Sequence, residues 1–113
     1  MSTLQLEAFV MTLVIEAGAA ALLAPRLGVV AWRAALAGVV GSAISHPIFW
    51  PAAVALSSEL GGFTVPFLEA IVILFESIAY RLIARTKWRL SLLLSLVANL
   101  TSWLVGWIVF ALQ

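Results

Sequence analysis

The chain has 113 residues, of which 65% are hydrophobic and only 10% are charged. A soluble domain carries roughly 25% charged residues, so this sequence cannot cover a water-exposed surface and is typical of an integral membrane protein. A net charge of +1 gives no case for nucleic-acid binding. Cysteine is absent, which excludes disulfides and thiolate metal sites. We therefore expect one domain whose main partner is the lipid bilayer.

Four apolar segments follow one another, at about residues 4–24, 31–56, 65–83 and 90–112. Each is long enough to cross about 30 Å of hydrocarbon as a helix, and lipid offers the backbone no other hydrogen-bonding partner. The sequence therefore predicts an all-α integral membrane protein. In it, residues 1–113 form a single transmembrane domain, a four-helix transmembrane bundle.

The second segment contains two prolines, Pro47 and Pro51. A proline inside a helix removes a backbone donor and clashes with the preceding turn, and two of them four residues apart are hard to absorb. We favour a helix over residues 31–47, followed by a proline-rich extension to residue 56 along the outer interface. A continuous, kinked helix is the alternative.

The basic residues predict the orientation in the membrane. All of them flank the first and third connections, and the middle connection carries only Glu59. The positive-inside rule makes the first and third connections cytoplasmic and places both termini on the non-cytoplasmic side. The basic residues are Arg26 and Arg33 at the first connection and Arg81, Arg85, Lys87 and Arg89 at the third.

The two halves of the chain resemble each other. In each half an acid, Glu16 or Glu76, precedes a basic turn, and a Trp-Arg pair then opens the next helix. That helix carries small and polar residues, at 40–45 in the first half and 97–102 in the second. The pattern predicts two helical-hairpin repeats that enter the membrane in the same direction, as parallel repeats. Glu16 and Glu76 would then be counterparts at equal depth.

Glu16, Glu76 and Asn99 fall at one level when depth is counted at 1.5 Å per residue from the outer helix ends. An acid inside a membrane is costly unless it is paired, protonated or facing water, and it marks a candidate functional site. We expect these side chains and Ser102 to converge on a polar cavity that binds a proton or a cation. The two acids would share one proton there. In the alternative, protonated acids bonded to neighbouring polar groups simply hold the bundle together.

Glu69 shares the face of Glu76, seven residues away, but lies nearer the outer surface. With His46 and Trp50 it forms a second candidate site in the outer half, where a His–carboxylate pair would titrate near neutral pH. The alternative for His46 is a cap on the helix end that Pro47 would create. One histidine without cysteine makes no dedicated metal or haem site.

The motifs of hydrolytic enzymes are absent, so we expect neither an enzyme nor a cofactor. The leading hypothesis is a small carrier or channel-like protein that binds protons or a cation. The competing hypothesis is a non-transporting accessory subunit or assembly factor of a membrane complex, in which the polar residues serve helix packing. Four short helices enclose little volume, which favours a homodimer or a larger membrane complex.

The basic rim at the third connection suggests a further partner, anionic lipid headgroups. The simpler interpretation, that these charges only set the topology, is the one we favour. Two acid-bearing hairpins, a His-Pro pair and an Asn-x-x-Ser helix together look like the small integral membrane proteins of bacteria. That similarity implies a multi-pass protein of the bacterial cytoplasmic (inner) membrane. The rim comprises Arg81, Arg85, Lys87 and Arg89.

Overall fold

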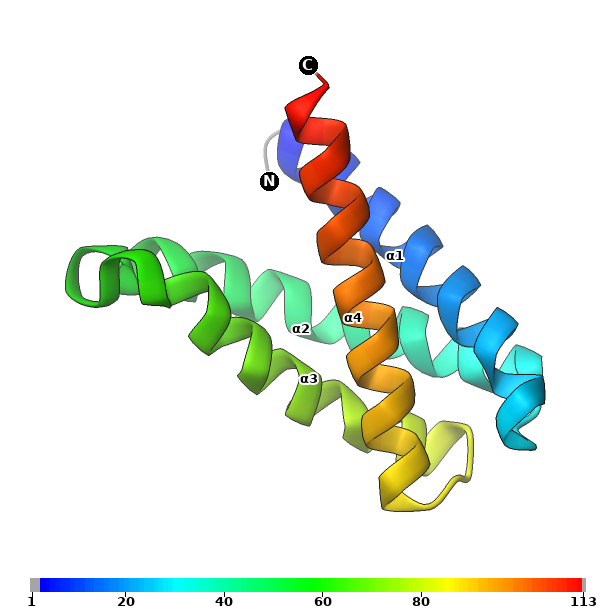
Figure 1. Cartoon of the computed structure of the whole chain (residues 1–113). Coiled ribbons are helices and arrows are strands. Elements are labelled where there is room, and N and C mark those ends of the chain that lie inside the picture. The colour runs from blue at the N-terminus through cyan, green and yellow to red at the C-terminus, as the bar shows by residue number, and fades with distance from the viewer. Residues whose placement is uncertain (1–2, 113) are drawn as a thin grey trace.

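The computed structural model describes residues 3–112, except for the side chains of Leu4 and Phe110. Over these residues the chain consists of helices and short connections (Figure 1). Two short 3-10 helices, η1 and η2, follow α1 and α2. In chain order the elements are α1 (Thr3–Leu23), η1 (Ala24–Leu27), α2 (Ala31–Leu60), η2 (Gly61–Phe63), α3 (Thr64–Ile83) and α4 (Trp88–Ala111).

Three helical stretches are long and apolar enough to cross a membrane: Gln5–Leu27, Ala31–Ile83 and Trp88–Val109. The second is 53 residues long and contains both α2 and α3. Their outer surface is apolar, with Leu22 82% and Leu82 71% exposed, which suits lipid and not water. The prediction of an all-α protein with helices able to span a membrane is confirmed.

The α-helices pack in a ring in chain order, with α1 beside both α2 and α4, and α3 beside both α2 and α4. Contact between α2 and α4 across the ring is slight. Figure 1 shows that the α2–α3 pair and the α1–α4 pair converge toward the end that carries the first and third connections, and diverge toward the other end. We call these the convergent and the divergent end.

The buried core lies toward the convergent end and is built mainly from alanine. Alanine has little side chain, so the helix backbones can approach closely there, as small residues allow in membranes. Tyr80 and Leu94, both fully buried, fill the remaining space. The core alanines are Ala20, Ala24, Ala34, Ala37, Ala84 and Ala98.

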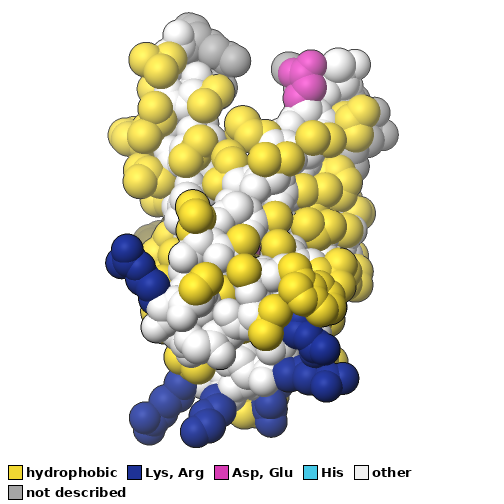
Figure 2. All heavy atoms as spheres, turned by 90° about the vertical axis from the view of Figure 1, so that its right-hand side faces the viewer, with side chains coloured by type: hydrophobic (Ala, Val, Ile, Leu, Met, Phe, Trp, Pro, Cys, Tyr) yellow, Lys and Arg dark blue, Asp and Glu magenta, His cyan; other side chains and the backbone are white. Residues whose placement is uncertain are grey.

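Basic side chains gather toward the convergent end as well. In the space-filling view they occupy the lower half of the molecule, and the face above them is largely hydrophobic (Figure 2). Two of them lie over tryptophan rings: Arg33 is 5.1 Å from the ring centre of Trp32, and Arg81 is 5.8 Å from that of Trp88. Such cation–ring contacts suit an interface between water and lipid.

The helix break favoured at Pro47 does not occur, because α2 runs without interruption from Ala31 to Leu60 and contains Pro47 and Pro51. Prolines four residues apart lie on one helix face, so the missing backbone hydrogen bonds fall on one side and the others continue. Both proline residues are exposed. In lipid, a helix break would leave more backbone N–H and C=O groups without a hydrogen-bond partner than the two prolines do. The favoured break at Pro47 is therefore wrong, and the helix is continuous, as in the alternative.

Both connections at the convergent end contain one residue with left-handed backbone geometry. Between α1 and α2 it is Gly28, with φ 71°, and between α3 and α4 it is Arg85, with φ 54°. Only glycine adopts this conformation without cost. The connection between α3 and α4 is held by Arg81, whose guanidinium donates a hydrogen bond to the carbonyl oxygen of Thr86 at 2.8 Å. The two hairpins thus turn by the same device.

α2 and α3 approach each other most closely at two glycines. A Cβ atom on Gly41 would lie 3.2 Å from Cγ of Glu76, and one on Gly38 would lie 2.9 Å from the hydroxyl oxygen of Tyr80. Tyr80 is fully buried, so its ring has little room to move aside. The two glycines therefore allow Glu76 and Tyr80 to lie against α2 in the interior.

We expect Gly38→Ala to lower the free energy of unfolding by about 1–3 kcal/mol, because its methyl group would overlap the Tyr80 hydroxyl. Gly18→Ala is the matched control, since a Cβ there has nothing within 4 Å and a helical alanine is slightly favourable. Denaturant unfolding in micelles measures both. In a Tyr80→Phe background the cost of Gly38→Ala should largely vanish. An equal cost in both backgrounds would contradict the close contact.

Candidate functional site

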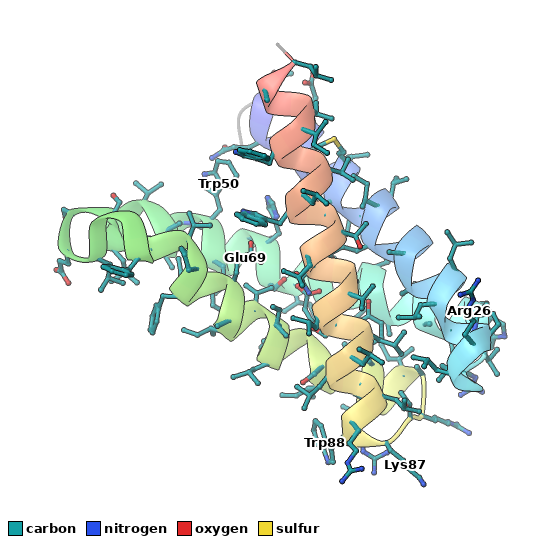
Figure 3. The ribbon with its side chains drawn as sticks, in the orientation of Figure 1. Arg26, Trp50, Glu69, Lys87 and Trp88 are labelled. Atoms are coloured by element: carbon teal, nitrogen blue, oxygen red, sulfur yellow. The ribbon has the colours of Figure 1, made fainter. Side chains whose placement is uncertain are left out.

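A pocket of about 380 Å³ lies between the helix pairs, on the side where they diverge. All four α-helices contribute to its wall. Figure 3 shows Trp50 of α2 and Glu69 of α3 at this opening, far from Arg26, Lys87 and Trp88 at the convergent end. Among the described residues that line the pocket, three are glutamates and none is lysine or arginine.

Glu16 of α1 and Glu76 of α3 lie at the floor of the pocket, where they are 2% and 1% exposed. Ser42 of α2 bridges them: its hydroxyl hydrogen-bonds Oε2 of Glu16 and lies 3.2 Å from Oε1 of Glu76. The hydroxyl of Ser45 donates to the other oxygen of Glu76 at 2.9 Å. The two acids predicted to be counterparts therefore meet at one serine.

The Ser42 bridge indicates how a proton is shared. A serine hydroxyl has one hydrogen to donate and two lone pairs to accept with. Between two carboxyl groups it can donate to one and must accept from the other, which then carries a proton.

Among the described residues that line the pocket, no lysine or arginine balances the acids at the floor. Two carboxylates in apolar surroundings without a counter-charge would be very costly, because neither water nor a paired cation offsets the lost solvation. The arrangement is therefore suited to hold a proton, and to exchange that proton for a cation that enters the pocket.

Asn99 of α4 completes the floor. It is 5% exposed, and its Nδ2 donates to the carbonyl oxygen of Ser95 at 2.8 Å. The Ser95 hydroxyl in turn donates to the backbone oxygen of Ile73 at 2.7 Å, which joins α4 to α3. Ser102 lies half-buried in the pocket wall. All four residues of the predicted inner site thus lie at one pocket.

The three residues of the predicted outer site, His46, Glu69 and Trp50, line the same pocket. The ring of His46 lies between Phe9 and Trp50, with centroid distances of 5.1 and 5.6 Å, and its buried Nε2 has no hydrogen-bond partner among the described residues. A His46–Glu69 pair is therefore not formed. The capping alternative also fails, because α2 does not end near His46.

Sequence reasoning missed the direct role of Ser42 and Ser45. It placed them only within the small and polar stretch 40–45, the counterpart of residues 97–102 in the second half. A signal was present, since both serines lie on the same helix face as Gly38 and Gly41, the face with the room to pack against a neighbour. A hydroxyl on such a face is placed to meet an acid on the adjacent helix.

Comparison of the chain with protein-family models, with curated proteins and with solved structures finds no match. The chemistry of the pocket itself must therefore carry the functional interpretation. Among the described residues, no group of three or more His, Asp or Glu side chains is arranged to hold a metal ion. The pocket offers an acid pair, hydroxyl groups and aromatic rings.

Ser42→Ala should lower the free energy of unfolding by about 1–3 kcal/mol, because it leaves both acids short of a partner in a buried site. Ser45→Ala should cost less, since only Glu76 loses a bond. Ser57→Ala, at an exposed hydroxyl, is the control and should stay within about 0.5 kcal/mol of wild type. Unfolding in micelles measures all three, and equal effects would contradict the bridging role.

Proposed function

We propose that the chain forms a four-helix transmembrane bundle of two parallel hairpin repeats in a bacterial cytoplasmic membrane, with both termini on the non-cytoplasmic side. Three observations support this arrangement. Basic side chains gather toward one end, each hairpin turns through one left-handed residue, and Glu16 and Glu76 meet at a single serine. The pocket would then open toward the non-cytoplasmic side.

The function proposed for this bundle is that of a small carrier or channel-like protein, which binds protons or a cation at Glu16, Glu76, Asn99 and Ser102. One observation carries the proposal: two buried acids from different hairpins share one hydroxyl at the floor of a pocket whose described lining residues include no lysine or arginine. The pocket above gives a cation access to the acids. An intramembrane acid with such access is a usual feature of ion and proton pathways.

The coupling would follow from charge balance. With one proton shared, the acid pair carries a single negative charge, and a monovalent cation at the floor would replace that proton. The proton leaves as the cation binds, so the charge in the apolar interior stays low throughout. Cation and proton then use the same site in turn, which is the requirement for exchange.

The second candidate is a non-transporting subunit of a homodimer or a larger membrane complex. It is favoured by the near-complete burial of Glu16 and Glu76 and by their hydroxyl donors, which suit a sealed packing contact. The two candidates differ in what happens when a cation is added: a carrier releases a proton and a packing contact does not.

Glu76→Gln should abolish the proton release that accompanies cation binding and the proton-coupled cation flux, because a glutamine keeps the shape but holds no exchangeable proton. Flux into proteoliposomes and pH change in weak buffer measure the two effects. Glu59→Gln is the matched control, since Glu59 is exposed at the end of α2, outside the pocket. Unchanged flux in a folded Glu76→Gln protein would remove Glu76 from the mechanism.

The proposed orientation can be tested cleanly because the chain contains no cysteine. A single cysteine at Ser58, exposed near the end of α2, should react with a membrane-impermeant maleimide on intact cells. One at Lys87, exposed before α4, should react only after the membrane is made permeable. The reverse pattern would invert the proposed topology, and labelling of both in intact cells would refute a fixed orientation.

A further inference from the structure

Tryptophan rings surround the outer part of the pocket. Trp50 of α2 and Trp103 and Trp107 of α4 line this pocket. At 1.5 Å per residue, Trp103 lies about 6 Å and Trp107 about 12 Å beyond Asn99 along α4. The rings therefore begin one helical turn above the acid pair and continue toward the mouth.

An aromatic belt at the membrane surface does not explain all three rings. Such belts place tryptophan at the level of the lipid headgroups. Trp103 is only one turn beyond the buried floor residue Asn99, within the apolar depth of α4. It shares a helix face with Asn99 and with Trp107, four residues further along, so this face of α4 presents an amide and then two rings to one cavity.

The volume of the cavity also argues against a bare inorganic ion as its ligand. A small hard cation needs six or more oxygen ligands close around it, or keeps its water. The floor offers carboxyl and hydroxyl oxygens, but the pocket of about 380 Å³ is lined for the rest mainly by aromatic rings and apolar side chains such as Leu68 and Val72. Aromatic and aliphatic side chains supply no oxygen ligands to such an ion, but they suit the apolar body of an organic ligand.

We propose that the pocket binds an organic ammonium cation whose charged group lies at Glu16 and Glu76 and whose apolar body lies along the tryptophan rings. The inference rests on the proposed function and adds the class of substrate to it. Ring faces attract a cation and its polarised substituents, most strongly when water is excluded. The acid pair supplies the charge, and the rings distinguish an organic cation from a hydrated metal ion.

Glu69 fits this assignment as an intermediate binding position for the cation. It is two helical turns, about 10 Å, nearer the mouth than Glu76, and it has no ion pair or hydrogen bond with any described residue. A carboxyl group free to face the cavity would draw a cation inward past the rings.

The test uses the full chain in lipid nanodiscs and four probes in calorimetry. Phenethylammonium has both a charge and an apolar body, methylammonium lacks the body, 2-phenylethanol lacks the charge, and Na⁺ is the inorganic cation. We expect phenethylammonium to bind at least about tenfold more tightly than each of the others and to release a proton. If methylammonium or 2-phenylethanol binds as tightly, the substrate class is wrong.

Variants then locate the effect. Trp103→Leu should weaken the binding of phenethylammonium about 3- to 10-fold, because the ring contacts the apolar body of this ligand. The affinity for methylammonium, which has no such body, should stay within about twofold. Trp88→Leu, at the convergent end and outside the pocket, is the matched control and should change neither. Trp50→Leu serves as a second variant in case Trp103→Leu does not fold. Equal effects of pocket and control variants would overturn the proposal.

The failure of this inference can be told apart from the failure of the proposed function. If Na⁺ or methylammonium releases a proton from the wild type but phenethylammonium binds no more tightly than they do, the carrier proposal is supported and the organic substrate class is wrong. If no cation releases a proton, the carrier itself fails, and the organic substrate fails with it.

Discussion

The structure depends on one contact, the hydroxyl of Ser42 between the carboxyl groups of Glu16 and Glu76. Acids buried in an apolar interior without a cation are tolerated only if hydrogen bonds and a proton replace the lost water. That requirement brings α1, α2 and α3 to one point. Gly41 favours it, because a Cβ atom there would lie 3.2 Å from Cγ of Glu76 and would require a small shift of that side chain.

The shape of the molecule follows from where its small and large residues lie. Alanines fill the core on the convergent side of the acids, and they let the helices approach closely. On the divergent side the pocket is lined by larger side chains, among them His46, Phe49, Trp50, Trp103 and Trp107. The acid pair lies between this pocket and the tightly packed alanine core.

Sequence reasoning could predict the helices and the meeting of Glu16 with Glu76, because both follow from one-dimensional quantities. Hydropathy gives the helices, and counting residues from the outer ends gives depth. It could not tell that His46 and Glu69 belong to the same cavity as the deep pair, because depth says nothing about which faces turn toward each other. The continuation of α2 past Pro47 was missed for a different reason. A proline inside a helix favours a break there. In lipid, however, backbone groups left without hydrogen bonds by a break would cost more than the prolines do.

The central claim is that Glu16 and Glu76 hold one proton between them, and infrared spectroscopy of the carboxyl carbonyl stretch tests it most directly. With glutamate labelled by carbon-13 at the carboxyl carbon, the protein at neutral pH should show a protonated carboxyl band. That band should shift in Glu16→Gln and in Glu76→Gln, because each variant removes one side of the shared hydrogen bond. The absence of a protonated band at neutral pH, or a band that Glu16→Gln leaves unchanged, would contradict the account.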